Sequence, residues 1–463
     1  MLFFQLDFLV LFLPALLAGA IVLKSFGPEG SAVWLASAAS LLFLYEFSGV
    51  SVLIAAVSIL LNYSGARFLM KNRDWRVFAA IVILNLLLLA YFKYSLALFG
   101  RPGDDGSGWL WRSALPLGIS FYTFQQIAFV SDVRNGKIEA FDLRTYSLFK
   151  LFFPQFIAGP ITHFNRVEAS YRRWPSFNAR SLRYGALLFL LGMLKKLAGD
   201  EFGAVTTHHL AGGAPVDASS AWIAALGFTF QIYFDFSGYS DMALGLARMF
   251  GVSLPFNFNS PYKAESLRAF WRRWHITLSN WLRDYLYIGL LGGSRHGKLA
   301  TLGVLMATMI LGGLWHGAGL AFLAWGAFHG LGLVFTRVMR VSLPVWAGRS
   351  FTFLFVVLGW VLFRASSLPA AVDWYCAMFG LAGTPAAPVL QPDSPLRDAG
   401  LCLAAGLSCF FLPNSQKIAL SASARGVRKF RHLEISLLLF AIVMISLAFI
   451  SPDPLNAFIY FEF

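Results

Sequence analysis

Apolar runs long enough to cross a lipid bilayer recur along almost the whole chain. A crossing helix needs about 20 mostly apolar residues. Runs of this kind begin near Leu9, Ala32, Val52, Val77, Tyr184, Ala221, Thr301, Gly319, Phe351, Ala399 and Ile435. Charged residues make up only 13% of the 463 residues, about half the share found in soluble proteins. We therefore expect an all-α integral membrane protein, a polytopic bundle of about eleven transmembrane helices.

The basic residues explain the orientation of the bundle better than they explain a ligand. The formal charge is +14, but the lysines and arginines cluster in short loops between apolar runs, as at Arg67–Arg76 and Arg166–Arg183. Loops of this kind face the cytoplasm, and this explanation excludes a nucleic-acid-binding role.

The first run, Phe8 to Leu23, lacks a basic segment before it and a small-residue cleavage site after it. We interpret it as a retained span and not as a signal peptide.

Two apolar segments are interrupted by proline and glycine, and we predict that both are re-entrant or kinked. They are Leu115–Val130 and Tyr146–Ile161. Broken helices at membrane depth are tolerated only where protein or a cavity surrounds them. Their polar residues either line a passage or satisfy backbone groups that proline and glycine leave free; they are Ser120, Tyr122, Thr123, Gln125, Gln126, Asp132, Gln155, Thr162 and His163.

A histidine stands inside an apolar, glycine-rich stretch, LGGLWHG, at Leu311–Gly317. A polar group at membrane depth is costly and is a functional candidate by default. The imidazole of His316 can accept a proton near neutral pH, as a general base must. A hydrogen-bonded structural histidine is the alternative.

The stretch Phe270–Tyr287, FWRRWHITLSNWLRDYLY, has helical amphipathic periodicity. One stripe is apolar and comprises Leu267, Trp271, Trp274, Leu278, Trp281, Leu282 and Tyr285. Arginines lie on the opposite face, and His275 falls at the border. We expect one helix at the membrane interface. Its positive charge suits either a phosphate-bearing donor or lipid headgroups.

Two acids lie in a third apolar stretch, FQIYFDFSGYSD, at Phe230–Asp241. Gln231 and Asp235 share a helix face, and Asp241 follows a polar interruption. Buried acids need partners, so these carboxylates could neutralise an arginine or hold a histidine in one tautomer. A structural ion pair and a proton relay are the other possibilities.

Several kinds of site are not indicated. The chain has no HExxH, GxSxG, P-loop or GxGxxG motif. Its three cysteines, Cys376, Cys402 and Cys409, form no CxxC pair, so neither a metal site nor a disulfide framework is predicted. We interpret His329, in the span after His316, as a polar residue that holds neighbouring helices together.

These stretches together resemble the membrane-bound O-acyltransferase family, in the branch of the alginate O-acetyltransferase membrane subunit. The similar segments are LPLGISFYTFQQIAFVSDV, FFPQFIAGPI, FQIYFDFSGYSDMALGLARMFGV, PFNFNSPYKAESLRAFWRRWHITLSNWLRDYLYIGLLGG, LGGLWHGAGLAFLAWGAFHG and FIYFEF. They extend over nearly the whole chain. The resemblance implies one domain over residues 1–463, with a signature core at about 115–335 around a central tunnel.

The resemblance also implies an activity and its site. His316 would be the catalytic histidine and His275 the second signature position. We assign supporting or donor-binding roles to Asp235, Asp241, Gln231, Arg272, Arg273, Trp315, Ser279 and Asn280. The donor is expected to be acetyl-CoA, with no permanently bound cofactor and no metal. The protein would lie in the bacterial inner membrane among lipids.

The expected partners are a periplasmic SGNH-type acetyltransferase and the polysaccharide synthesis machinery. The acceptor remains open among alginate, cellulose, peptidoglycan, other exopolysaccharides, lipid and protein. Two other classes of function also remain. A transporter coupled to protons through Asp235 and Asp241 should show inverted repeats, and none is seen. A non-catalytic scaffold would not need His316.

Overall fold

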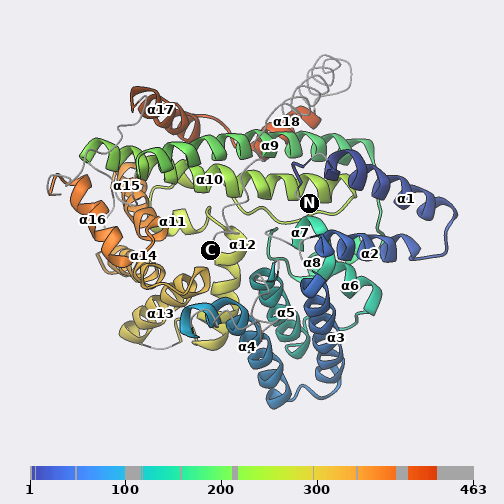
Figure 1. The fold of residues 1–463 in the computed structure, drawn as a ribbon. Helices are drawn as coiled ribbons and strands as arrows, with labels where there is room; N and C mark the ends of the chain where they lie inside the picture. The colour runs from blue at the N-terminus through green and yellow to red at the C-terminus, as the bar shows by residue number, and fades with distance from the viewer. Residues whose placement is uncertain are drawn as a thin grey trace, which may run out of the picture. The chain divides into compact units, whose positions relative to one another are not determined.

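The computed structural model describes residues 3–5, 7–46, 49–99, 116, 118–156, 159–210, 217–295, 297–339, 343–381 and 395–424. Every regular element in these ranges is a helix (Figure 1), as the apolar runs predicted. The chain forms two compact units. Unit 1 comprises residues 1–193, 239–256 and 415–454, and unit 2 comprises residues 194–238, 257–414 and 455–463. The single domain expected from the resemblance stays a prediction.

Unit 1 contains the N-terminal helices. They are η1 (Phe8–Phe12), α1 (Leu13–Phe26), α2 (Ser31–Tyr45), α3 (Gly49–Asn72), α4 (Trp75–Phe99), α5 (Ile119–Arg134), α6 (Leu143–Leu151), α7 (Phe153–Phe156) and α8 (Phe164–Arg172), with α18 (Ser415–Ala424). Buried amides join three of these helices. Asn62 of α3 and Asn85 of α4 donate to each other at 3.2 and 2.9 Å, and Gln126 of α5 donates to Ser58 at 3.4 Å. Such bonds hold apolar helices in register inside a membrane.

The two interrupted segments pack against each other within unit 1. Gly118 has a φ of +72° and lies against the carbonyl of Phe156, where a Cβ would clash. Only glycine meets both demands at little cost. As predicted, the second segment is broken, because α6 ends at Leu151 and α7 begins at Phe153. The first is an unbroken helix from Ile119 that is buried through Val133.

Unit 2 contains the elements that carry the signature motifs. They are η3 (Pro261–Lys263), α11 (Leu267–Trp271), α12 (Ile276–Trp281), η4 (Leu282–Leu290), α13 (Lys298–His316), α14 (Leu320–Met339), α15 (Val345–Arg364), α16 (Leu368–Met378) and α17 (Pro395–Phe411). Two long helices are divided between the units. They are α9 (Ala179–His208), which enters unit 2 at Leu194, and α10 (Ala218–Met249), which leaves it after Gly238.

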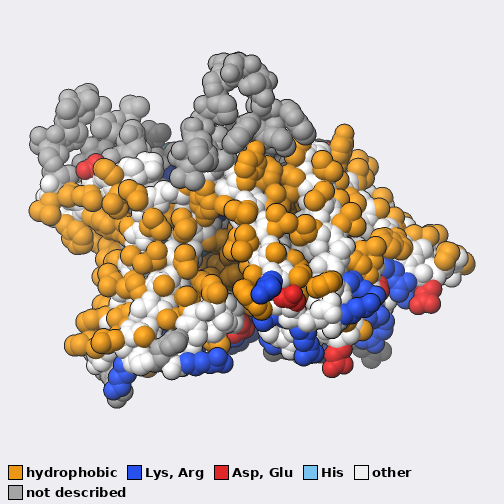
Figure 2. Space-filling model, turned by 90° about the horizontal axis from the view of Figure 1, so that it is seen from below, with side chains coloured by type: hydrophobic (Ala, Val, Ile, Leu, Met, Phe, Trp, Pro, Cys, Tyr) orange, Lys and Arg blue, Asp and Glu red, His pale blue; other side chains and the backbone are white. Residues whose placement is uncertain are grey.

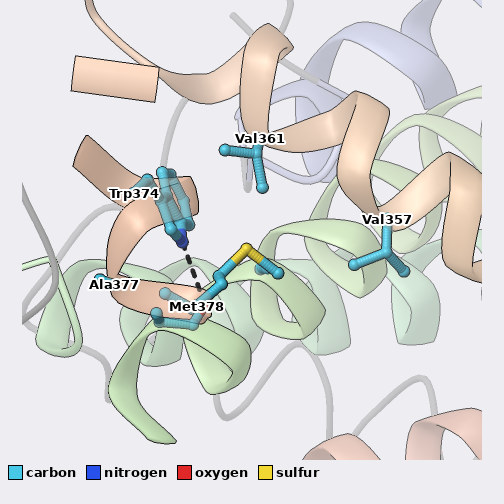
Figure 3. Packing of buried hydrophobic residues seen from close by; sticks show 8 residues of the cluster. Val357, Val361, Trp374, Ala377 and Met378 are labelled. Atoms are coloured by element: carbon cyan, nitrogen blue, oxygen red, sulfur yellow. Dashed lines mark hydrogen bonds between the residues drawn. The ribbon is translucent and has the colours of Figure 1, made fainter. Parts of the chain in front are cut away.

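A small-residue face of α10 allows α15 and α16 to pack closely in unit 2. Val357, Val361, Trp374 and Met378 are buried against alanines of α10 (Figure 3). The indole of Trp374 donates to the carbonyl of Ala221 at 3.0 Å. Apolar packing and the hydrogen bond of the Trp374 indole therefore both stabilise the core of this unit.

Six of the described helices are long and apolar enough to span a membrane. They are Phe8–Phe26, Gly49–Asn72, Trp75–Tyr94, Lys298–His316, Leu320–Met339 and Val345–Arg364. A seventh span results if α17 and α18 form one broken crossing. Figure 2 shows hydrophobic side chains exposed across much of the visible face, as lipid contact requires. The larger count of about eleven stays a prediction, and the run at Ile435 lies outside the described residues.

Candidate active site

A tightly packed helical hairpin, α13 and α14, places His316 at its turn. Gly313 of α13 lies against the carbonyl of Phe322. A Cβ on Gly326 of α14 would come within 2.5 Å of the carbonyl of Met309. These glycines let the two helix backbones touch, as small residues do between membrane helices. The WHG histidine is thus fixed by backbone-to-backbone packing.

His316 is surrounded by aromatic rings and is 6% exposed. Its ring centroid lies 4.7 Å from that of Trp315, 5.2 Å from that of Trp325 and 5.1 Å from that of Phe363. All three rings meet the imidazole edge to face. This arrangement holds the imidazole in one position and keeps bulk water from it, which strengthens electrostatic interactions with a reacting group.

The prediction of one amphipathic helix over Phe270–Tyr287 is wrong. The stretch forms α11, a break at Arg272–His275, α12 and the π-helix η4. At the break His275 has φ 41° and ψ 55°, a left-handed conformation that costs a non-glycine residue about 1–3 kcal/mol. The amphipathic periodicity of the stretch did not reveal that the helix ends at Trp271 and that a new helix begins at Ile276.

Long-range hydrogen bonds from the segment before α11 stabilise this break. The carbonyl of Asn257 accepts from the Ile276 amide at 2.9 Å, and its side-chain oxygen accepts from the Thr277 hydroxyl at 2.6 Å. The Asn259 amide donates to the carbonyl of Arg273 at 3.0 Å. His275 is thereby turned inward and is 1% exposed.

Burial makes His275 a neutral residue. Its ring packs edge to face on Phe236 of α10, with centroids 4.7 Å apart. Desolvation lowers the pKa of His275 to about 3, because burial disfavours the charged imidazolium. His275 is therefore uncharged at physiological pH, and charge for binding an anionic donor must come from other residues.

A pocket of about 400 Å³ leads to His316. One wall is a single face of α13, with Leu305, Met309, Gly312 and His316 at helical spacing. The facing walls come from α14 and from the broken segment α11–α12–η4. The pocket therefore brings together residues of the LGGLWHG and FWRRWHITLSNW motifs, although His275 is not among the described residues that line it.

Four arginines line this pocket: Arg268, Arg272, Arg283 and Arg337. Arg337 is twelve residues beyond Trp325 on α14, which corresponds to about 18 Å along the helix. Trp325 lies beside His316, so one end of the pocket holds a histidine and the other a cation. Such a gradient suits a ligand with a reactive group at one end and anionic groups at the other.

A second cavity of about 750 Å³ adjoins the first. Arg268, Thr336 and Arg337 line both cavities. Glu265 also lines the second cavity and pairs with Arg349 at 3.2 Å. The two shared arginines can therefore reach anionic groups in either space.

Some of the predicted site residues line the pocket, and others do not. Arg272, Ser279 and Asn280 line the pocket with His316. His275, Arg273 and Trp315 lie in the same unit but are not among the described residues that line it. Trp315 packs on His316 and also approaches His275, with centroids 6.4 Å apart.

Asp235 has a basic partner, but it is a lysine that the sequence analysis did not consider. Lys196 of α9 lies 2.9 Å from Asp235 and 2.6 Å from Asp200, and its side chain is 2% exposed. Gly199 permits this close approach of the helices, because a Cβ there would come within 2.8 Å of the Asp235 backbone. Gln231 similarly packs on Gly203. These contacts indicate a buried ion-pair cluster joining α9 to α10.

Asp241 and the polar residues of the interrupted segments lie in unit 1. Asp241 accepts from Gln416 at 2.8 Å and from Ser415, at the start of α18. Asp132 is paired with Lys137 at 3.1 Å and with His163 at 3.3 Å. These contacts give both carboxylates a helix-joining role within their own unit.

Sequence reasoning gave no role to several described residues of the pocket lining, among them Trp325 and Leu333. Gly312 and His316 are four residues apart on one helix, a spacing that could have identified the pocket wall. Trp325 carried no comparable signal, because an aromatic residue in an apolar helix is ordinarily core. His329, interpreted as a polar residue that holds neighbouring helices together, is fully buried and packs on Trp271 and Trp325 at 5.2 and 5.0 Å.

Comparison with known proteins shows the family of the chain. The model of MBOAT, the membrane-bound O-acyltransferase family, matches residues 67–357. The chain is 40% identical over 351 residues to the probable alginate O-acetylase AlgI of Pseudomonas syringae, over 73% of this chain and 66% of that protein. It is 36% identical over 434 residues to the peptidoglycan O-acetyltransferase of Helicobacter pylori, over 81% and 79% of the two chains.

A more distant relative is the teichoic acid D-alanyltransferase of Streptococcus thermophilus, 32% identical over 232 residues. That alignment covers 47% of this chain and 56% of the relative. The matched region of this chain spans about two thirds of the length of the Pseudomonas relative. The family match includes both histidine motifs and the whole of the pocket. The chain belongs to the membrane-bound O-acyltransferase family.

Proposed function

We propose that the protein is an O-acyltransferase that takes an acetyl group from acetyl-CoA and passes it toward a polysaccharide hydroxyl. The observation that carries this proposal is the pocket itself, whose lining combines His316 with four arginines. Membership in the family supports the reaction class.

The shape and charge of the pocket support a coenzyme A thioester as donor. Such a molecule bears its acyl group at one end of a long flexible arm and its phosphates at the other. From Leu305 to His316 the wall of α13 extends about 16 Å, and Arg268, Arg272, Arg283 and Arg337 supply positive charge. Arginine binds phosphate well because its planar fork donates two hydrogen bonds.

His316 would act on the acceptor hydroxyl. In the transfer the carbonyl–sulfur bond breaks and a carbonyl–oxygen bond forms, and the hydroxyl proton passes to the departing thiolate. A neutral imidazole can take that proton and deliver it. Assistance by His316 in acyl transfer from the thioester is the other role consistent with its place. His275, neutral and outside the pocket lining, would support His316 through Trp315.

The site also needs a route for the acceptor from the far side of the membrane. Acetyl-CoA is too large and charged to cross a bilayer, whereas an acetyl group is small. We propose a tunnel within a bundle of about eleven crossings, in the bacterial inner membrane, that separates donor from acceptor. A periplasmic SGNH-type acetyltransferase would then receive the acetyl group and serve the polysaccharide synthesis machinery.

Two acceptors have support from the relatives. Alginate is favoured by the 40% identity to the Pseudomonas protein. Peptidoglycan is favoured by the longer alignment with the Helicobacter protein, which covers 81% of this chain. The transporter hypothesis is weakened, because Asp235 is engaged by Lys196 and Asp241 by Ser415 and Gln416.

The experiment is acetyl transfer in liposomes. Protein is reconstituted, acetyl-labelled acetyl-CoA is supplied on one side, and alginate or peptidoglycan oligosaccharide with the candidate periplasmic partner on the other. Label in one oligosaccharide, dependent on the protein, supports the proposal and identifies the acceptor. Transport of intact coenzyme A without loss of its acetyl group would contradict it.

A further inference from the structure

The wall of the donor pocket beside His316 is an indole. Trp325 lines the pocket, is 2% exposed and packs edge to face on the imidazole at 5.2 Å between centroids. Trp315 and Phe363 cover other sides of the same histidine. A group that reacts beside His316 must therefore fit among rings that are already in contact.

Trp325 has little freedom to move away. Its indole lies 5.0 Å from the ring of His329 and 6.0 Å from that of Trp360, with which it stacks at 18°. His329 is itself fully buried, and Gly359 lies so close that a Cβ would come within 2.7 Å of the His329 Nε2 atom. Close packing of this kind resists rearrangement.

We propose that Trp325 sets the upper size limit of the transferred acyl group and restricts the enzyme to short groups such as acetyl. The inference rests on the proposed donor pocket. For reaction, the acyl carbonyl carbon and the attacking atom must come within about 3–3.5 Å of each other. Of the rings of Trp315, Trp325 and Phe363 that pack on His316, that of Trp325 is the one among the described residues that line the pocket, so the carbons beyond a carbonyl beside His316 meet its indole.

The size of the effect follows from the packing. One methylene more or less in a fitted apolar pocket changes relative rates by about 10–200-fold. Removing the indole in Trp325→Ala opens space for several carbons. Trp325→Phe opens less and keeps an aromatic ring against His329, so it serves as a second variant should the alanine variant fail to fold.

A matched control lies on the same helix. Leu333 lines the same pocket but is eight residues further along α14, about 12 Å from Trp325. Leu333→Ala also enlarges the pocket, but away from His316. Any loss of donor affinity in this variant applies to all acyl lengths alike.

The experiment compares acetyl-, butyryl- and hexanoyl-CoA with the full chain in liposomes, by thiol release in the presence of the candidate periplasmic partner and alginate or peptidoglycan oligosaccharide. Binding of coenzyme A alone is measured in parallel. The wild type should prefer acetyl over hexanoyl by at least about tenfold, from the cost of fitting extra methylenes. Trp325→Ala should reduce that ratio by tenfold or more, Trp325→Phe should reduce it for butyryl, and Leu333→Ala should leave it within twofold.

An unchanged ratio in folded Trp325 variants, or an equal change in Leu333→Ala, would overturn the inference while leaving the proposed function intact. Equal rates of thiol release from hexanoyl-CoA and acetyl-CoA by the wild type would also overturn the inference. Failure of the wild type to bind coenzyme A and to release thiol from acetyl-CoA overturns the proposed function, and the inference with it.

Discussion

His275 and His316 are packed against the same indole, that of Trp315. The ring centroids are 6.4 Å apart for His275 and 4.7 Å apart for His316. The histidines are 41 residues apart in the chain, on either side of the segment that contains η4. Trp315 therefore connects the strained turn that presents His275 with the hairpin that presents His316.

Replacing Trp315 should slow the chemical step more than it weakens donor binding. Trp315→Leu removes the shared ring, and a misplacement of about 1 Å in a catalytic group can cost about 10²-fold in rate. Trp315 is not among the described residues that line the donor pocket, so we expect kcat to fall about 10²-fold while KM for acetyl-CoA changes little. Steady-state thiol release gives both constants.

The control is Trp374→Leu, which removes another buried indole of unit 2 in a separate apolar cluster. It should lower Tm and leave kcat near the wild-type value. A rise in KM at constant kcat in Trp315→Leu would place that residue in donor binding instead.

His275 should make stability depend on pH below neutrality. Its pKa is lowered to about 3 in the fold by burial, against about 6.5 in the unfolded chain. Between these values the unfolded state binds more protons, so the contribution of His275 falls as pH drops below about 6.5 and is constant above it. The Tm difference between wild type and His275→Gln should therefore shrink between pH 7.5 and pH 5.

The exposed His208 provides the comparison. His208→Gln controls for the general effect of replacing a histidine by glutamine in this unit. A difference between wild type and His275→Gln that is identical at pH 7.5 and pH 5 would show that His275 is not buried as a neutral ring.

The arginines shared by the two cavities should govern donor affinity. Arg268→Gln with Arg337→Gln removes two charges that line both spaces. We expect KM for acetyl-CoA to rise about tenfold or more, since hydrogen bonds to charged groups contribute about 1.5–3 kcal/mol. The dependence of KM on salt should also weaken.

Arg349→Gln is the matched variant, because Arg349 pairs with Glu265 and is not among the described residues that line the pocket of His316. Its KM should stay within about twofold of the wild-type value, as expected for an exposed ion pair. Equal effects of the two sets of variants would argue against specific phosphate binding.

The contact between α13 and α14 should not tolerate a methyl group. Gly313→Ala puts a Cβ against the Phe322 carbonyl, so the hairpin must open and His316 must shift. Overpacking of this kind costs about 1–3 kcal/mol, and we expect a lower Tm in detergent together with loss of thiol release. Gly303, on the same helix, has nothing within 4 Å of an added Cβ, so Gly303→Ala should retain both.

The sequence predicted those parts of the fold that depend on local pattern. Apolar runs near Leu9, Val52, Val77, Thr301, Gly319 and Phe351 correspond to the six helices that qualify as spans within the described ranges. The break at His275 was missed because it depends on Asn257 and Asn259, which come from a separate segment. A helical wheel has no means of representing such a contact.

The sequence motifs that carry site residues could be predicted, but the contacts between helices around the site could not. His316 was visible as a polar residue in an apolar run, and the arginines as one face of a periodic stretch. The basic partner of Asp235 was not visible in the sequence. A signal for a buried ion pair was present, because Lys196 and Asp200 are four residues apart in an apolar helix. That Lys196 also reaches Asp235 depends on how α9 packs on α10, which no local pattern encodes.

The most direct test of the account is acetyl-CoA turnover by wild type and His316→Ala in liposomes, with acceptor present and equal folding shown by Tm. His208→Ala is the matched control, an exposed histidine in the same unit. Loss of a general base lowers rates about 10²–10⁴-fold, so we predict at least that loss for His316→Ala, unchanged coenzyme A binding and full activity in His208→Ala. Equal turnover in wild type and folded His316→Ala would contradict the assignment of the reaction to this histidine and favour a scaffold.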